Sequence, residues 1–314
     1  MEHDNAIINR DVRSKAIYGK LFRPSSHERL PGIIVLGGSG GGLRWSYSIA
    51  YNLACEGYAA LALAYFSYED LPHGLINIPL EYFQSAFDWL TSQSDIDTEK
   101  LTLVGGSRGA ELALLLGSYF QEIKAVVGYA PSSVVWGANG GPSSINKPAW
   151  TYKNKPVPHM GVRLSSKLAF ELTKMIRSLS FGKTFQAVSL LKTALESKKY
   201  VEQSRIKVEK INGPILLISG GDDSLLPSVL LAEMVMRRLE SYRHPFPYKH
   251  LSYKGAGHSI NAPGMSLEQY PTKMTHMLTK LICDLGGSHF VNADASNNAW
   301  HEVKCFLADQ LSCR

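Results

Sequence analysis

The stretch KLTLVGGSRGAELALLLGS, residues 100–118, joins a strand pattern to a helix pattern with almost no chain between them. Leu101–Val104 is a continuous apolar run that is typical of a buried strand, and Ala110–Leu116 is an Ala/Leu-rich run that is typical of a buried helix. Only Gly105–Gly109 separates the two runs. A side chain at the apex of so sharp a turn projects away from the fold, so we interpret Ser107 as a residue used in chemistry.

Gly-x-Ser-x-Gly is a short motif, and only its context makes it informative. Here a strand precedes the motif, a helix follows it, and the small residues Gly109 and Ala110 stand where the helix must pass close to the strand. This is the pattern of a nucleophile elbow, which exposes a serine oxygen at the top of a sheet beside the free N–H groups of a helix N-terminus. The pattern predicts that Ser107 is a nucleophile.

A serine hydroxyl needs a base to activate it and a carboxylate to orient that base. After an elbow of this kind, the acid and the histidine follow in that order, each behind a later strand. His258 stands in a glycine turn behind a late strand pattern, and we predict it to be the base; the alternative is a loop histidine that caps the turn. Asp222 and Asp223 compete for the acid role. We favour Asp223, four residues before Pro227, and expect the other to cap the next helix or to face water.

Acyl-group chemistry at a serine also needs two N–H donors that stabilise an oxyanion. We predict that one donor is the backbone amide of Arg108, directly after the candidate nucleophile. The second is expected from the glycine-rich loop Gly37–Gly42, where Gly38, Ser39 or another residue of the loop could supply it. A phosphate-binding loop is the rival interpretation, but the stretch lacks both Gly-Lys-Ser/Thr and the spacing G-x-G-x-x-G.

Outside the elbow, strand patterns and helix patterns alternate along the chain. Strands are predicted at 16–22, 32–36, 59–64, 101–104, 125–129, 215–219 and 249–253. Helices are predicted at 45–56, at 79–92, from 107 onward, at 227–239 and at 298–311. Such alternation predicts an α/β fold with a mostly parallel central sheet covered by helices on both faces, and we expect residues 1–314 to form one domain.

Residues 131–210 separate two predicted strands by far more chain than a crossover helix needs, which predicts a helical cap or lid over the site. Between residues 139 and 210 there are 14 Lys/Arg and only 4 Asp/Glu. These cations could bind an anionic ligand or only keep the segment soluble. Five apolar side chains in this segment follow a helical spacing, and we favour a packing face over the lining of an acyl channel: Phe170, Leu172, Met175, Ile176 and Leu179.

The totals describe a soluble globular protein: 45% of residues are hydrophobic, 19% are charged, and the net charge is +6. No apolar run is long enough for a membrane span, and the first residues have no apolar core of a secretory signal, so we expect a cytoplasmic protein.

No nucleic-acid partner, cofactor or metal is predicted. The cysteines lack ligand spacing, and we expect Cys55 to be buried in a helix. Three loop histidines are expected at the surface: His73, His159 and His244.

Several stretches together resemble the catalytic domain shared by acyl-CoA thioesterases and bile acid-CoA:amino acid N-acyltransferases, a branch close to the dienelactone hydrolases. The resemblance is carried by residues 37–72, 80–90, 105–118, 211–223, 255–263 and 285–300, and the signature at Tyr65–Pro72 is quite specific. It implies an α/β-hydrolase fold and a Ser/Asp/His site at Ser107, Asp223 and His258 acting on acyl-CoA thioesters.

Two departures from the family pattern qualify that implication. Eukaryotic members carry an N-terminal β-sandwich domain, whereas only about thirty residues precede the core here, so the chain resembles a stand-alone form. Members that make amides place Cys at the nucleophile, so Ser107 favours hydrolysis. The alternatives are a carboxylesterase or dienelactone-type hydrolase, acyl transfer to an amine or alcohol, and a non-catalytic scaffold. The expected partner is a small acyl thioester or ester, anionic if it carries CoA; the sequence does not indicate an oligomeric state.

Overall fold

The computed structural model describes residues 6–14, 17–25, 29–139, 144, 146–161, 165–261, 270–275 and 280–311. The strands of the central sheet are β1 (Ile7–Arg13), β2 (Tyr18–Pro24), β3 (Leu30–Leu36), β4 (Ala59–Ala64), β6 (Ile96–Gly106), β7 (Ala125–Tyr129), β10 (Ile215–Gly220) and β11 (Tyr248–Tyr253). The helices are α1 (Arg44–Cys55), α2 (Leu80–Thr91), α3 (Arg108–Tyr119), α4 (Ser166–Ser180), α5 (Ala187–Leu195), α6 (Lys198–Ser204), the short 3₁₀ helix η2 (Val208–Lys210), α7 (Ser228–Ser241) and α8 (His289–Leu311).

The central sheet has the strand order β1-β2-β4-β3-β6-β7-β10-β11. Strands β4 to β11 in this order run parallel, whereas β2 is antiparallel to both of its neighbours. The carboxyl ends of β3, β6 and β7 therefore meet at one edge, where ligand sites of open parallel sheets form. Two small sheets lie outside it, formed by β5 (Ile78–Pro79), β8 (Trp150–Tyr152) and β9 (Lys155–Pro156), and by β12 (Lys273–Thr275) and β13 (Ile282–Asp284).

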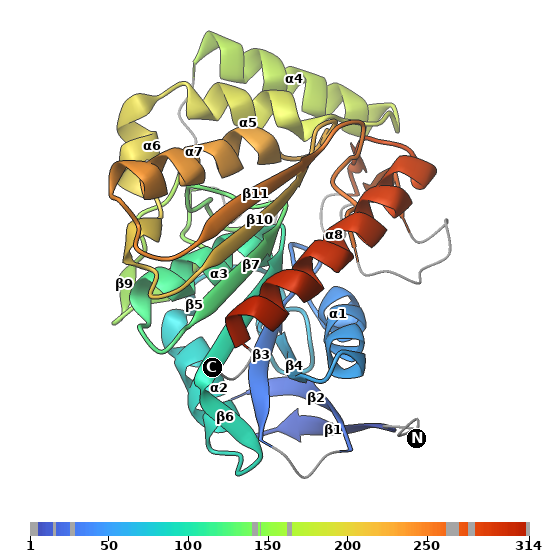
Figure 1. Ribbon diagram of the computed structural model, residues 1–314. Coiled ribbons are helices and arrows are strands. Elements are labelled where there is room, and N and C mark those ends of the chain that lie inside the picture. The colour runs from blue at the N-terminus through green and yellow to red at the C-terminus, as the bar shows by residue number, and fades with distance from the viewer. Residues whose placement is uncertain are drawn as a thin grey trace.

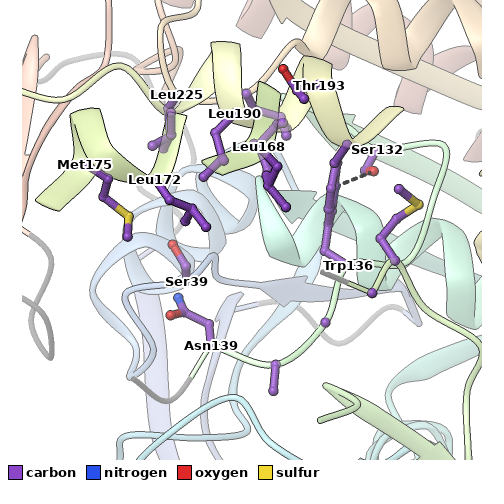
Figure 2. Close-up of a pocket in the computed structure, with 18 of the residues that line it drawn as sticks. Ser39, Ser132, Trp136, Asn139, Leu168, Leu172, Met175, Leu190, Thr193 and Leu225 are labelled. Carbon is purple, nitrogen blue, oxygen red and sulfur yellow. Dashed lines mark hydrogen bonds between the residues drawn. The ribbon is translucent and has the colours of Figure 1, made fainter. Parts of the chain in front are cut away.

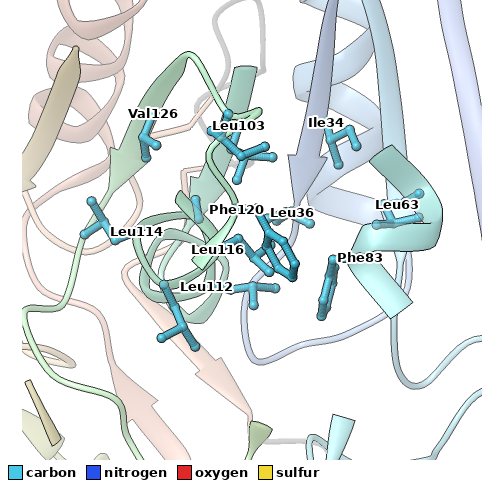
Figure 3. Close-up of a cluster of buried hydrophobic side chains, with 14 of the residues drawn as sticks. Ile34, Leu36, Leu63, Phe83, Leu103, Leu112, Leu114, Leu116, Phe120 and Val126 are labelled. Carbon is cyan, nitrogen blue, oxygen red and sulfur yellow. The ribbon is translucent and has the colours of Figure 1, made fainter. Parts of the chain in front are cut away.

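Alternate residues of the central strands belong to two hydrophobic clusters, one on each face of the sheet. On β3, Ile34 and Leu36 join the cluster that packs under α2, α3 and α7, while Ile33 and Val35 join the cluster under α1 and α8. Figure 3 shows part of the first cluster, with Phe83 of α2 near Leu36 and the leucines of α3. The two-residue period of the strands thus supplies a core on both faces, as expected for an α/β fold.

The 131–210 segment leaves the sheet after β7 and returns to it at β10. It contains β8, β9, α4, α5, α6 and η2. In Figure 1, α4 forms the outermost layer at the top of the molecule, and α5 and α6 lie between α4 and the rest of the fold. The predicted helical character of this segment is confirmed over the described residues.

The predicted α/β fold with helices on both faces is confirmed, whereas several elements differ from the sequence analysis, among them β6, which begins at Ile96 and not at residue 101. Strand β1 was not predicted, because its mostly exposed residues give an edge strand no apolar pattern. Helix α8 begins at His289 and not at residue 298. Its first turns contain Asn and Ser, which favour helix ends, but Asn292 and Ser296 are fully buried here, so tertiary packing overrides propensity. The start of the predicted strand at residue 16 and Cys313 lie outside the described residues.

Two predictions of burial are wrong. Cys55 is exposed, because it ends α1 away from the face that buries Ile49 and Leu53. His244 is buried, and its Nε2 lies 3.1 Å from the carbonyl oxygen of Gly213. As predicted, His73 is exposed.

Candidate active site

The Gly105–Gly109 turn has the geometry of a nucleophile elbow. Ser107 has φ +56° and ψ −118°, a conformation that is unfavourable for a non-glycine residue. Its amide donates to the carbonyl oxygen of Tyr129 at 2.7 Å, which fixes the turn to β7. A Cβ at Gly109 would stand 2.1 Å from the carbonyl oxygen of Leu36, so only glycine lets α3 begin so close to β3. The strained serine is therefore held by backbone contacts on two strands.

Three side chains that the sequence analysis singled out meet at this edge of the sheet. Ser107 Oγ lies 3.0 Å from His258 Nε2, and His258 Nδ1 lies 2.8 Å from Asp223 Oδ2. The side chain of His258 is 11% exposed and that of Asp223 is 2% exposed. Both distances are within hydrogen-bond reach, which a base and its orienting carboxylate require.

The two candidate aspartates have different surroundings. Asp223 Oδ1 accepts from the amides of Leu225 and Leu226 at 2.9 Å each, and Oδ2 accepts from the hydroxyl of Ser228 at 2.8 Å. Asp222 is exposed, so it faces water, one of the two positions expected for the aspartate that does not orient the histidine. Four hydrogen bonds, including the one from His258, hold the Asp223 carboxylate in a single orientation.

Hydrogen bonds to α8 and to the chain just before it hold the glycine turn that carries His258. The amide of Gly257 donates to Asn292 Oδ1 at 2.7 Å, and the amide of His258 donates to the carbonyl oxygen of Leu285 at 2.7 Å. Asn292 is fully buried. The end of the chain therefore positions the imidazole, although it lies far from Ser107 in the sequence.

The Gly37–Gly42 loop lies beside the elbow. A Cβ at Gly38 would stand 3.2 Å from the Cβ of Ser107 and 3.8 Å from the amide nitrogen of Arg108. The hydroxyl of Tyr65 donates to the carbonyl oxygen of Gly37, and the amide of Gly42 donates to the carbonyl oxygen of Phe66 at 3.0 Å. The Tyr65–Pro72 signature thus contacts the loop that approaches the serine, while Ser39 lies in the wall of the adjoining cavity.

One buried carboxylate joins the elbow to the 131–210 segment. Glu111 Oε1 accepts from Trp150 Nε1 at 3.1 Å and from the amide of Trp136 at 3.3 Å. Its Oε2 lies 3.2 Å from Arg108 Nη1, and Arg108 Nη2 donates to the carbonyl oxygen of Trp136 at 3.1 Å. Burial raises the pKa of Glu111 from 4.5 to about 7, and the Arg108 charge acts in the opposite direction.

A cavity of about 1160 Å³ adjoins Ser107. Ser39, Ser107 and Arg108 lie in its polar part, and helices α4 and α5 supply much of the apolar wall. Figure 2 shows the labelled apolar side chains above Ser39 and Asn139; they are Leu168, Leu172, Met175, Leu190 and Leu225. Its volume exceeds that of a typical small-molecule pocket, so a long or bulky apolar group fits beside the serine.

The apolar side chains of α4 do not form the packing face that we favoured from the sequence. Leu172, Met175, Ile176 and Leu179 line the cavity, whereas Phe170 is 61% exposed and does not line it. The only buried residues of α4 are Leu168 and Glu171. The apolar side chains of α4 therefore do not mainly form a packing face, because most of them line the open cavity.

Three residues that position the site were missed by the sequence analysis: Ser228, Asn292 and Glu111. Ser228 donates one hydrogen bond to Asp223, and Asn292 accepts one from the turn that carries His258. Nothing in the local sequence of either residue indicates these contacts. Glu111 did give a signal, because it is a lone carboxylate in the apolar run GAELALLLG. Such a residue on a buried helix face needs a polar partner.

In the part of the chain that the structure describes, no cluster of three or more His, Cys, Asp and Glu side chains is arranged to hold a metal ion. Likewise, none of the described helices has the length and hydropathy needed to cross a bilayer.

Comparisons with known sequences agree with the resemblance described above. The family model "BAAT / Acyl-CoA thioester hydrolase C terminal" matches residues 78–313. The chain is 30% identical over 303 residues to mouse "Acyl-coenzyme A thioesterase 2, mitochondrial", covering 96% of this chain and 60% of the relative. It is also 30% identical over 301 residues to mouse "Bile acid-CoA:amino acid N-acyltransferase", covering 96% and 64%. The chain therefore spans only 60% and 64% of the length of these two relatives.

Comparisons with solved structures agree on the fold. A dienelactone hydrolase-like promiscuous phosphotriesterase from metagenomic libraries matches with a TM-score of 0.56 and 16% identity, covering 97% of this chain and 99% of that one. A putative dienelactone hydrolase from Klebsiella pneumoniae matches with a TM-score of 0.53 and 15% identity, covering 97% and 99%. At such identities the likeness concerns the fold alone, and it confirms a dienelactone hydrolase-like α/β-hydrolase architecture.

Proposed function

The chain belongs to the BAAT / acyl-CoA thioester hydrolase C-terminal family, and on this premise we propose that it is a serine hydrolase of acyl-CoA or related thioesters. The observation that carries the proposal is the continuous set of contacts from Ser107 through His258 to Asp223 beside a large apolar cavity. Relatives named as acyl-coenzyme A thioesterases support the choice of thioesters.

In the first half of the reaction, Ser107 Oγ attacks the thioester carbonyl carbon while His258 Nε2 takes the hydroxyl proton. Asp223 keeps the other ring nitrogen, Nδ1, protonated and stabilises the imidazolium that forms. The carbonyl oxygen becomes an oxyanion, for which we assign the amide of Arg108 as one donor and the amide of Gly38 or Ser39 as the other. When the intermediate collapses, the C–S bond breaks and His258 returns the proton to the leaving sulfur.

In the second half, water replaces the thiol. His258 Nε2 takes a proton from water, the oxygen attacks the acyl carbon, and the bond to Ser107 Oγ breaks as the proton returns to that oxygen. The products are a carboxylic acid and the regenerated serine.

A CoA leaving group also carries phosphates, and we assign cations of the 131–210 segment to them. Thr193, Ser197 and Tyr200 line the cavity. Lys192, Lys198 and Lys199 are their exposed chain neighbours, and within the described residues none of these lysines forms an ion pair within 4.0 Å. Lysines on mobile side chains bind phosphate as point charges. In this proposal the segment acts as a cap that holds both ends of the substrate.

The test is a substrate panel of acyl-CoAs of several chain lengths together with p-nitrophenyl esters, with product identification by mass spectrometry. Release of free CoA and free acid at rates above those for the esters is the expected result. Turnover of esters without turnover of any CoA thioester would leave the serine chemistry intact but show that the substrate class is wrong.

Acyl transfer is the second candidate function, and the similarity of the chain to an N-acyltransferase supports it. It differs only in the acceptor, because an amine would replace water in the second half. Adding glycine or an alcohol to the same panel separates the two reactions. An N-acyl amino acid or an ester in place of the free acid would identify a transferase.

A further inference from the structure

Helix α4 carries two stripes of side chains with identical spacing on opposite sides. Leu168, Leu172, Met175 and Leu179 follow the spacing i, i+4, i+7 and i+11, and all four line the cavity. The same spacing from residue 170 gives the outer stripe, which consists of Phe170, Lys174, Arg177 and Phe181, the last being the C-cap residue directly after α4. A helix with 3.6 residues per turn places these two sets on opposite faces.

The outer stripe exposes two large aromatic side chains. Phe170 is 61% exposed and Phe181 is 69% exposed. The ammonium group of Lys174 lies 4.5 Å from the centre of the Phe170 ring. α4 is also the outermost element at the top of the molecule (Figure 1). An exposed apolar group of this kind on a convex helix indicates a contact surface.

Positive charge predominates at the surface around this stripe, and the one exposed carboxylate beside it, Glu196, pairs with Lys167 at 2.9 Å. Lys167, Lys174, Arg177 and Lys183 are all exposed. From residue 165 to residue 195 the sequence contains a single acidic residue, Glu171. It is buried, and it pairs with Lys174 at 2.8 Å. The outward face of α4 therefore combines aromatic rings with an excess of positive charge.

The cavity opens along the same helix. Ile176 is 58% exposed and Leu179 is 49% exposed, yet both line the cavity. The flank of α4 is thus part of the cavity wall and part of the molecular surface.

We propose that the outward face of α4 docks on an anionic lipid surface. Basic amphipathic helices with aromatic side chains lie in the headgroup region, where the rings insert and the cations bind lipid phosphates. The excess of positive charge on this face, with Arg177 and Lys183 beside the two exposed rings, matches anionic headgroups. Docking in this orientation would bring the open flank of the cavity to the bilayer, from which amphiphilic molecules enter.

The test is sedimentation of the full chain with vesicles of phosphatidylcholine alone and of phosphatidylcholine with phosphatidylglycerol. We expect binding only to the anionic vesicles. Two double variants should each bind these vesicles at least about tenfold more weakly than the wild type. They are Phe170→Gln/Phe181→Gln and Lys174→Gln/Arg177→Gln. The matched control is Arg237→Gln/Tyr242→Gln, which removes an exposed cation and an exposed aromatic residue at the end of α7 and should bind like the wild type.

Folding of each variant is checked by circular dichroism and by ester turnover, so a lost contact is separated from a lost structure. Absence of binding to anionic vesicles, or binding that neither α4 variant weakens, would overturn the proposal. A dimer in analytical ultracentrifugation that Phe170→Gln/Phe181→Gln dissociates, without vesicle binding, would assign the face to a second copy of the chain instead. The readout is binding, so the result does not depend on whether the chain is a thioesterase.

Discussion

Helices α3 and α5 are both rich in leucine and alanine, but their surroundings are opposite. Ten of the twelve residues of α3 are buried, whereas none of the nine residues of α5 is. The difference lies in their partners. α3 packs against β6 and β7 in the centre of the fold, whereas α5 belongs to the 131–210 segment and turns Leu190 and Leu191 toward the cavity. The same composition therefore stabilises the core in one region and leaves room for a ligand in the other.

The largest expected effect concerns the site at the N-terminus of α3. Ser107→Ala should lower kcat by about 10³-fold or more, because no other group in the proposal can form the acyl-enzyme. The midpoint of thermal unfolding should hardly change, since Ser107 is only half-buried and contributes little packing. Steady-state kinetics and calorimetry on the same sample provide both values. Wild-type turnover by the alanine variant would remove the serine from the mechanism.

The next effect separates the two aspartates. Asp223→Asn should lower kcat by about 10²- to 10⁴-fold, because the imidazole loses the carboxylate that fixes its protonated nitrogen. Asp222→Asn serves as the matched control and should stay close to wild type, since its side chain faces water. Equal losses in the two variants would contradict the assignment of Asp223.

A pair of leucine truncations tests the comparison of helices directly. Leu112→Ala in α3 should cost about 2–5 kcal/mol of unfolding free energy, because it leaves a cavity in a packed core. Leu190→Ala in α5 should cost less than about 1 kcal/mol, because its side chain is only half-buried beside open space. Urea denaturation measures both. The α5 variant should instead shift the preferred acyl chain length in the substrate panel, and a large stability loss there would show that α5 is packed after all.

Glu111 couples the two regions, and its protonation gives a pH-dependent effect. Its pKa of about 7 in the folded chain lies above the ordinary value of 4.5, so the folded state binds the proton more tightly. Its contribution to the free energy of unfolding is therefore complete below pH 4.5 and is lost as the pH rises to about 7. Glu111→Gln should remove this part of the pH dependence, and Glu99→Gln, at an exposed position, should keep it. Identical pH profiles for wild type and Glu111→Gln would contradict the assignment.

The smallest expected effect concerns the charges of the 131–210 segment. Lys198→Glu/Lys199→Glu should raise KM for an acyl-CoA by about tenfold, because two phosphate-binding charges are reversed. The KM for an uncharged p-nitrophenyl ester should stay the same and is the internal control. A parallel rise for both substrates would indicate a structural defect and not lost phosphate binding.

The contrast between core and segment also explains what the sequence could predict. Core strands such as Ala59–Ala64 and Ala125–Tyr129 match their predicted bounds, because buried parallel strands are short, continuous apolar runs. The juxtaposition of Ser107, Asp223 and His258 followed from their order behind successive strands. The two-sided pattern of α4 could not be predicted, because a stripe that lines a cavity and a stripe that packs a core have the same spacing. Contacts such as Ser228 with Asp223 depend on backbone placement that no local pattern encodes.

The proposed chemistry depends on Ser107 being a nucleophile that His258 and Asp223 activate. The most direct measurement is labelling of the native protein with a fluorophosphonate, followed by peptide mapping by mass spectrometry. We predict one phosphonylated residue, Ser107, with labelling slowed strongly by His258→Ala and abolished by Ser107→Ala. Folded protein that stays unlabelled, or that carries the label on another residue, would contradict it.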